Sequence, residues 1–375
     1  CGDDGGEFLY KKVEEFSPAK AQHRAIALTA KCGWVPSKFT KTGVPTCDKG
    51  ILADLAEQYE LARYMQEYQQ YSKLGTTYIP AFAKTDVAGR IHPSFPLTAT
   101  RTGRFSSRGP NFQNLPRDDR VRSLVRAHKG NVIINVDLSQ IELRVLAWYC
   151  ANVINNFYLW GLYQQGADVH EANRQLLECE RATAKKAIFT KVYGGGATKI
   201  ASGCGISLSE AKRTVDFMNN RMPFISELNK VLVNTALTNG CKLSTMYGHS
   251  LAYPDLKSYD NSKRARAERQ IFNGAIQGTS ADIIKLLMCI LHYEHRLAER
   301  FKCLLLFTIH DELSFEVPEG NAPICMETID KVFCNKQLLP GLPIEGISGQ
   351  GETWLEAKKD SDRRYEEWHK ETYGD

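Results

Sequence analysis

Apolar and polar positions alternate along the chain with two different periods. Apolar residues recur at spacings of three and four between Ile51 and Met65, which predicts one amphipathic helix. Similar helical patterns cover residues 140–237 and 265–293. The other regular pieces are short apolar runs of the kind found in buried strands. These predicted strands are residues 131–137, 304–309, 313–317 and 343–347.

Glycine and proline mark the connections between these elements. Two glycines and two prolines within residues 33–48 predict a loop. Residues 244–254 predict a β-hairpin that turns at Gly248. The acidic, glycine-rich start of the chain, CGDDGGE, has the composition of a flexible leader. We find no internal repeat, and the helical stretches lie between strands that we expect to form one sheet. The pattern therefore predicts an α+β protein.

Composition narrows the class of protein. A chain of 375 residues is long enough for two or three subdomains around a sizeable core. Its 43% hydrophobic and 24% charged residues exclude an intrinsically disordered or coiled-coil protein. The most apolar run contains Asp282 and Lys285, so we expect no membrane span. The net charge of +5 is compatible with a polyanionic partner.

Cysteine usage bears on the cellular compartment and on metal binding. The eleven cysteines are odd in number and none are spaced as C-x-x-C, which argues against structural zinc and against a disulfide framework. We therefore expect a reducing, cytoplasmic location. The chain begins at Cys1 without a signal sequence, so we expect it to derive from a longer polypeptide.

Two acidic residues stand at the ends of predicted strands. Asp137 ends the strand 131–137, and Asp311 lies at the turn between strands 304–309 and 313–317. An acidic residue at the end of an apolar strand is costly unless something binds it. On neighbouring strands the pair could hold two divalent ions roughly 4 Å apart, an arrangement that assists phosphoryl transfer. The alternative is that each residue only caps a strand or a turn.

A stripe of cations and aromatic rings follows at helical spacing. Arg181, Lys185, Phe189 and Tyr193 are four residues apart, so their side chains wind slowly along one face, and glycines 194–196 are expected to end the helix. Two cations followed by two rings suit a nucleoside triphosphate that lies along the helix. The alternative is an ordinary amphipathic helix with a solvated basic end.

Further polar groups fit a nucleic-acid partner, each with a plainer alternative. His170 could add a phosphate donor, although a lone histidine is often structural. Arg269, Asn273 and Gln277 are spaced by four on a predicted helix and suit minor-groove acceptors, or else bonds to the protein's own backbone. Residues 101–126 hold seven arginines against two acidic residues, which indicates a phosphate-contacting surface or a solvated loop.

Together these pieces resemble the motifs of family A DNA polymerases, the group that includes bacterial DNA polymerase I and many phage replicative polymerases. The matching segments are TGRFSSRGPNFQNLP (102–116), VDLSQIELR (136–144), RATAKKAIFTKVYG (181–194), ERQIFNGAIQGTSADIIK (268–285) and IHDELSFEV (309–317). Residues 248–258 also resemble the family's connecting hairpin. The resemblance extends over residues 16–357 and suggests a phage or viral type.

The resemblance implies a right-hand polymerase fold, with an antiparallel-sheet palm, helical fingers and a short helical thumb. The implied divisions are a flexible leader (1–15), an abbreviated thumb with its connection to the palm (16–85), a first part of the palm (86–150), fingers (151–243), a second part of the palm (244–357) and a charged tail (358–375).

The resemblance also implies the site residues. Asp137, Asp311 and the Leu138 carbonyl would bind two Mg²⁺ ions, for which Mn²⁺ could substitute, and Glu312 would be an auxiliary acid. The residues implied to bind the dNTP are Arg181, Lys185, His170, Phe189, Tyr193, Gln140 and Glu142, with Lys185 also protonating the leaving pyrophosphate. Those implied to contact DNA are Arg104, Arg269, Asn273, Gln277, His310, Asn111, Gln113 and Asn114.

The function implied is template-directed DNA synthesis on a primer–template duplex, without a 3′–5′ exonuclease in this chain and without a membrane. A helicase, a primase or a larger parent polypeptide are the expected protein partners. A single-subunit RNA polymerase is one alternative, although Glu142 resembles the family's steric gate against ribonucleotides. A catalytically inactive DNA-binding relative is the other. Leu138 departs from the aromatic residue common at its position, and Phe189 stands where some relatives carry Tyr.

Overall fold

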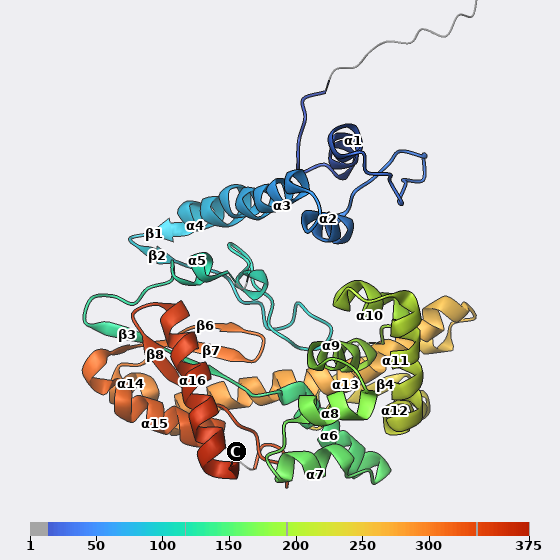
Figure 1. Ribbon diagram of the computed structural model, residues 1–375. Helices are drawn as coiled ribbons and strands as arrows, with labels where there is room; N and C mark the ends of the chain where they lie inside the picture. The colour runs from blue at the N-terminus through green and yellow to red at the C-terminus, as the bar shows by residue number, and fades with distance from the viewer. Residues whose placement is uncertain (1–13, 117, 193, 335–336, 375) are drawn as a thin grey trace, which may run out of the picture. The chain divides into compact units, whose positions relative to one another are not determined.

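The computed structural model describes residues 14–116, 118–192, 194–334 and 337–374 (Figure 1). The chain divides into two compact units, Cys1–Ile91 and His92–Asp375, which we call the smaller and the larger unit. Most of the predicted leader and the predicted site residue Tyr193 lie outside the described residues.

The smaller unit is helical and has its own small core. Its elements are α1 (Ala21–Cys32), α2 (Lys49–Ala56), α3 (Glu60–Lys73), η1 (Leu74–Tyr78), α4 (Ile79–Thr85), β1 (Asp86–Val87) and β2 (Arg90–Ile91). Apolar side chains from α1, α2 and α3 pack together in this core. The Asp48 side chain accepts hydrogen bonds from the backbone N–H groups of Gly50 and Ile51, which fixes the start of α2.

The prediction of one helix between Ile51 and Met65 is wrong, because the chain turns between α2 and α3. The backbone N–H of Tyr59 still bonds to the Leu55 carbonyl at 2.8 Å, but α3 begins only at Glu60. The turn lets the apolar faces of both helices meet in one core. A continuous helix would have left one of these faces without a partner.

The larger unit contains a four-stranded antiparallel sheet in the order β6-β7-β3-β8. Its strands are β3 (Asn131–Asp137), β6 (Leu304–Ile309), β7 (Glu312–Pro318) and β8 (Gly349–Gly351). β3 lies inside the sheet with its five central residues buried, which accounts for its apolar side chains. The one polar residue among the five, Asn135, donates hydrogen bonds to Glu312 and Ser314 of β7. The first three predicted strands are therefore confirmed.

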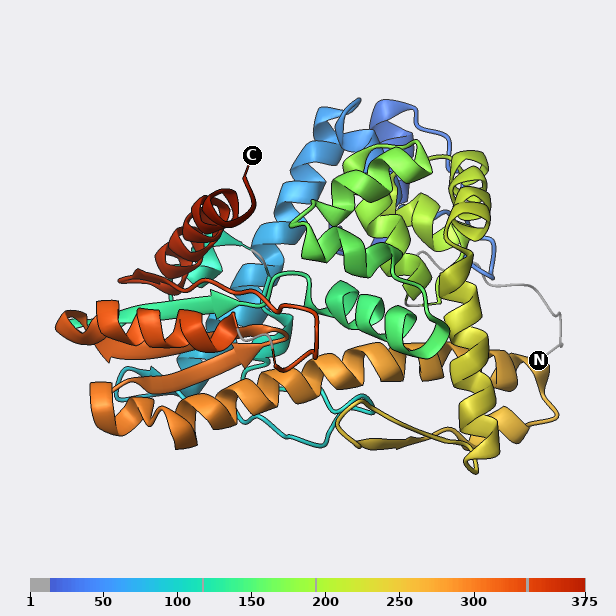
Figure 2. The same ribbon diagram turned by 90° about the horizontal axis from the view of Figure 1, so that it is seen from below.

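Helices surround this sheet and form a separate helical part of the same unit (Figure 2). They are η2 (Phe112–Asn114), α5 (Asp119–Arg122), α6 (Ile141–Ile154), α7 (Tyr158–Gln164), α8 (Val169–Leu177), α9 (Arg181–Val192), α10 (Ala197–Cys204), α11 (Leu208–Arg221), α12 (Pro223–Thr238), η3 (Pro254–Lys257), α13 (Asn261–Cys289), η4 (Ile290–Glu294), α14 (Leu297–Phe301), η5 (Glu319–Asn321), α15 (Ala322–Phe333) and α16 (Trp354–Tyr373). The predicted hairpin is also present, as β4 (Lys242–Ser244) and β5 (Ser250–Ala252).

The long helix α13 connects the two parts of the larger unit. It runs from the helical part, where it packs against α12 and α6, to the side of the sheet (Figure 2). The stretch Asn261–Glu294 is long and apolar enough to cross a membrane by length and composition alone, which the sequence prediction did not recognise. Since 61% of its most apolar window is buried inside the protein, its surroundings are those of a core helix.

The prediction of a strand at residues 343–347 is wrong, since the last strand is β8. Residues 343–347 instead cross the end of β3, where the Glu345 carbonyl accepts a hydrogen bond from the Ser139 N–H at 2.8 Å. β8 carries two glycines for a steric reason. A Cβ on Gly349 would lie 2.0 Å from the Ser361 backbone nitrogen, so only glycine lets α16 approach the sheet this closely.

The predicted charged tail forms most of α16. This helix begins with a capping box, in which Thr353 and Glu356 satisfy each other's backbone N–H groups, and it packs on β3 and β8. The residues from Lys358 onward are therefore part of the folded larger unit as far as Tyr373.

Candidate active site

The two predicted carboxylates meet at one end of the sheet. Asp137 is the last residue of β3 and pairs in register with Glu312, the first residue of β7. Asp311 comes directly before Glu312, and its carbonyl accepts a hydrogen bond from the Leu138 N–H at 3.2 Å. The tight turn before it is made by His310, which has a φ of +56°. This geometry places Asp137, Leu138 and Asp311 side by side, as the sequence predicts.

The electrostatics of this corner show that the carboxylates interact. Burial, followed by the negative charge of Asp137, raises the pKa of Asp311 to about 7. Asp137 Oδ1 is buried and has no hydrogen-bond partner among the described residues, while Asp137 Oδ2 accepts from Lys358 Nζ at 2.9 Å. A buried, unpartnered carboxylate oxygen next to a second carboxylate fits the donor set of a divalent cation.

The protein itself supplies few ligands for a cation at this corner of the sheet. Within the described part of the chain, no three or more His, Cys, Asp and Glu side chains are grouped so that they could hold a metal ion. Glu312 is turned away into the core, where its Oε1 accepts from Asn135 Nδ2 at 2.6 Å and from Trp354 Nε1 at 2.5 Å. A cation would thus be held by Asp137, Asp311 and backbone oxygen, with Glu312 supporting the sheet beneath.

The raised pKa of Asp311 makes a prediction about stability. A carboxyl group whose folded pKa lies above its unfolded value of 3.8 destabilises the fold progressively as the pH rises from about 4 to 7. Asp311→Asn should therefore increase the free energy of unfolding of the metal-free protein at pH 8, by on the order of 1–2 kcal/mol, because the carboxyl keeps some contact with water. Urea unfolding in EDTA at pH 5 and pH 8 measures the difference, and an equal gain at both values would contradict it.

The predicted stripe lies on α9. Arg181 and Lys185 are exposed and Phe189 is half-buried, all on the same helix. Arg181 Nη2 binds Asp168 Oδ2 at 2.6 Å, and Asp168 also caps the start of α8. α9 ends at Val192, and Gly194 follows with a φ of +68°, as the glycine run predicts.

His170 on α8 joins this group. Only 3% of it is exposed, and its ring centroid lies 6.2 Å from that of Phe189. Burial, followed by the charge of Lys185, lowers the pKa of His170 to about 4, so the imidazole is neutral at physiological pH. Its Nδ1 is buried and has no hydrogen-bond partner in the described ranges, so no described hydrogen bond of this atom stabilises the fold.

The second polar series lies along α13. Arg269 is exposed, whereas Asn273 and Gln277 are partly buried. A Cβ on Gly194 would lie 2.6 Å from Arg269 Cδ, so the segment that ends α9 passes directly over this arginine. The two predicted stripes are therefore neighbours in the fold.

The arginine-rich segment folds back onto the helices rather than lying open to solvent. Arg104 forms an ion pair with Glu142, which is 7% exposed at the start of α6. Lys285 Nζ of α13 donates to the Gly103 carbonyl at 2.6 Å. Arg104 and Glu142 were predicted to have separate roles, and their ion pair was not predicted.

The remaining predicted DNA and nucleotide contacts differ in exposure. Asn111 and Asn114 are exposed, as is His310. Gln113 is buried. Its Nε2 donates a hydrogen bond to the Thr308 carbonyl at 2.5 Å, and its Oε1 accepts one from the His310 N–H at 3.0 Å. Gln140 accepts a hydrogen bond from the Tyr163 hydroxyl at 3.1 Å. Gln113 and Gln140 thus have structural partners, and their predicted contacts with DNA and dNTP stay predictions.

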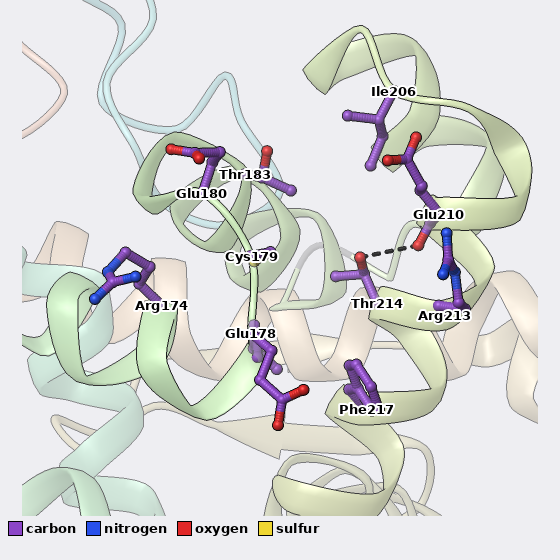
Figure 3. A pocket seen from close by; sticks show the side chains of 11 residues that line it. Arg174, Glu178, Cys179, Glu180, Thr183, Ile206, Glu210, Arg213, Thr214 and Phe217 are labelled. Carbon is purple, nitrogen blue, oxygen red and sulfur yellow. Dashed lines mark hydrogen bonds between the residues drawn. The ribbon is translucent and has the colours of Figure 1, made fainter.

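A cavity of about 650 Å³ opens elsewhere, between the α8–α9 connection and α11 (Figure 3). Glu178 and Glu180 line one side of it, and Arg213 and Glu210 line the other. Among the described residues, none of the predicted site residues belongs to this lining. Its walls carry charges of both signs, so no single ligand chemistry follows from it.

Comparisons with known proteins agree with this geometry. Residues 7–356 match the family model described as DNA polymerase family A. The chain is 32% identical over 338 residues to the thermostable DNA polymerase I of Thermus filiformis, covering 85% of this chain and 39% of that protein. It is 31% identical over 364 residues to DNA polymerase I of Streptococcus pneumoniae, covering 92% of this chain and 40% of that protein. The chain thus spans about two fifths of the length of these relatives.

A solved structure gives the same result for the fold. The POL domain of Pol1 from M. smegmatis, in complex with DNA primer-template and dNTP, matches with a TM-score of 0.79 and 26% identity, covering 92% of this chain and 62% of that one. This likeness confirms the predicted mixed fold of helices and antiparallel sheet as a polymerase fold. The chain belongs to DNA polymerase family A.

Proposed function

We propose that this chain catalyses template-directed DNA synthesis, in which a primer 3′-OH attacks the α-phosphate of a dNTP. The observation that carries the proposal is the meeting of Asp137 and Asp311 at one end of the sheet, with a buried oxygen of Asp137 left without a described partner. Membership of the polymerase family supports it. The proposed activity is synthesis alone, without a 3′–5′ exonuclease in this chain.

In the proposed mechanism, Asp137, Asp311 and the Leu138 carbonyl would hold two Mg²⁺ ions, with Mn²⁺ as a substitute. When bound, such ions lower the charge on the attacking and leaving oxygens of an in-line displacement. Arg181 and Lys185 on α9 bind the triphosphate, and Lys185 gives a proton to the departing pyrophosphate. Most of the catalysis then comes from positioning and charge stabilisation.

The neighbouring groups select the nucleotide and the base pair. The neutral imidazole of His170 donates a hydrogen bond to the phosphates, while Phe189 and Tyr193 pack against the incoming base and the templating position. Arg104, Asn273 and Gln277 contact the minor groove of the new pair, which presents nearly the same acceptors for every sequence. Arg269 approaches the template, and His310, Asn111 and Asn114 lie toward the primer.

A single-subunit RNA polymerase and an inactive DNA-binding relative are the competing functions. Primer extension on DNA and RNA templates, with dNTPs and rNTPs supplied separately, distinguishes all three. The proposal predicts extension with dNTPs on DNA. Extension with rNTPs alone would support the RNA polymerase, and duplex binding without any extension would support the inactive relative.

The identity of Phe189 makes a further prediction about chain terminators. The wild-type protein should strongly prefer dNTPs to dideoxynucleotides, and Phe189→Tyr should reduce that preference by roughly tenfold or more, because the added hydroxyl offers a hydrogen bond where the 3′-OH is missing. Competing dNTP and dideoxynucleotide incorporation on one template measures the ratio. Equal preference in both proteins would contradict the assignment of Phe189 to the nucleotide site.

The finer assignments are also proposals. We propose residues 16–85 as the thumb with its connection, 86–150 and 244–357 as the palm, and 151–243 as the fingers. A cytoplasmic location, a helicase or primase partner and a phage or viral type complete the proposal. The relatives named above are bacterial, so the viral type rests on the sequence resemblance alone.

A further inference from the structure

The helix α16 brings a lysine to the candidate metal site. Lys358 lies in its second turn with only 14% of its side chain exposed. Its Nζ donates to Asp137 Oδ2 at 2.9 Å and to Asp362 Oδ1 at 2.8 Å. The lysine therefore bridges the end of β3 and the next turn of its own helix, 221 positions away from Asp137 in the sequence.

The surroundings keep this lysine charged. Burial lowers its pKa, but the carboxylates of Asp137, Glu312 and Asp362 together outweigh burial, and the net effect is a raised pKa. Burial, followed by the charge of Asp137, raises the pKa of Asp311 and of Glu312. A fixed ammonium beside Asp137 thus offsets repulsion among the three carboxylates.

The two oxygens of Asp137 have different environments. Lys358 holds Oδ2, while Oδ1 is buried and without a hydrogen-bond partner in the part of the chain that the structure describes. An ammonium and a divalent ion repel each other at the same carboxylate. Asp362 is four residues further along the helix and offers the lysine a second acceptor that needs no change in the backbone.

We propose that Lys358 is a positioning residue that orients Asp137 and competes with divalent ions for it, so that α16 sets the metal affinity of the active site. The inference rests on the proposed function, in which Asp137 is a metal ligand. Lys358 acts through Asp137: it holds the carboxylate in place before metal binding and shifts toward Asp362 when a cation arrives.

Mn²⁺ binding to the protein without DNA or dNTP tests this role. The free ion is followed by electron paramagnetic resonance, and the site is defined as the binding lost in Asp137→Asn. Lys358→Met keeps the apolar stem and removes the charge, so it should bind Mn²⁺ roughly tenfold more tightly than the wild type. Asp362→Asn removes the negative charge that draws Lys358 away from Asp137, so this variant should bind Mn²⁺ more weakly than the wild type. Lys358→Arg should stay close to the wild type.

The matched control is Lys359→Met. Lys359 is the next residue on the same helix, is exposed, and pairs with Asp119 at 2.9 Å rather than with the carboxylates of the sheet. The Mn²⁺ affinity of Lys359→Met should stay within about twofold of the wild-type affinity, because the loss of an exposed ion pair has only a small effect. Primer extension runs in parallel, with a lower rate expected for Lys358→Met in saturating Mg²⁺ because Asp137 loses its orientation.

The outcomes separate the two proposals. Unchanged or weaker Mn²⁺ binding by Lys358→Met would overturn the role of Lys358 while wild-type extension still supports the polymerase. Absence of extension by the wild type would overturn the polymerase and leave the Mn²⁺ comparison standing. If circular dichroism shows that Lys358→Met does not fold, Mn²⁺ binding by Asp362→Asn tests the role of Lys358 instead, because Asp362 is exposed. Tighter or unchanged Mn²⁺ binding by Asp362→Asn would contradict the inference.

Discussion

Asp137→Ala and Asp311→Ala are each expected to slow nucleotide addition by on the order of 10³-fold or more, while primer–template affinity changes by no more than a few-fold. Asp137 ends β3 and Asp311 directly precedes the neighbouring strand β7. Burial, followed by the negative charge of Asp137, raises the pKa of Asp311. In the proposed mechanism both residues are cation ligands, and bound cations contribute several kcal/mol to phosphoryl transfer. The proposed duplex binding would depend instead on cationic and polar groups that contact the DNA backbone.

Single-turnover addition of one dNTP measures the rate, and fluorescence anisotropy with a labelled duplex measures the affinity. Glu327→Ala is a suitable control, because this carboxylate lies on the exposed face of α15 and pairs with Lys331. Glu327→Ala should change neither the rate of dNTP addition nor the affinity for the duplex. Loss of duplex binding in the aspartate variants, with the rate on bound duplex unchanged, would mean that Asp137 and Asp311 only maintain the fold.

Glu142→Ala is expected to shift the preference for deoxynucleotides over ribonucleotides by roughly a hundredfold toward ribonucleotides. The Glu142 side chain is buried at the start of α6 and held by Arg104, so its position is fixed before a nucleotide arrives. In its proposed role, the Glu142 side chain would exclude the 2′-OH of a ribonucleotide by its volume. Alanine removes that volume and also releases Arg104 from its ion pair.

Glu142→Gln separates volume from charge, because glutamine has nearly the same size as glutamate. If exclusion is steric, the glutamine variant keeps most of the wild-type preference, and the alanine variant does not. Incorporation rates for matched dNTP and rNTP pairs give the ratio directly. An alanine variant that still rejects ribonucleotides would remove Glu142 as the selecting residue.

Local patterns in the sequence predicted several elements and indicated that Asp137 and Asp311 could meet. The stretch 131–137, rich in β-branched residues, was predicted as a buried strand and coincides with β3, whose five central residues are buried. The meeting of Asp137 with Asp311 followed from the same strands, since each residue stands at a strand end. The glycine run after α9 likewise predicted where that helix ends.

The features that the sequence did not reveal depend on contacts between distant segments. Residues 343–347 were predicted as a strand, but the sheet instead takes up β8, whose glycines allow α16 to lie against it. Lys358 lies in a charged stretch that resembles a solvated tail. The capping box at Thr353 was the available signal that a helix begins there and carries Lys358 toward the carboxylates.

Anomalous diffraction from crystals grown with Mn²⁺, primer–template and a non-reactive dNTP analogue would show whether Asp137 and Asp311 hold the catalytic metal ions. We expect two manganese peaks within coordination distance of carboxylate oxygens from Asp137 and Asp311, next to the triphosphate. Manganese bound elsewhere, or either carboxylate pointing away from the nucleotide, would contradict it.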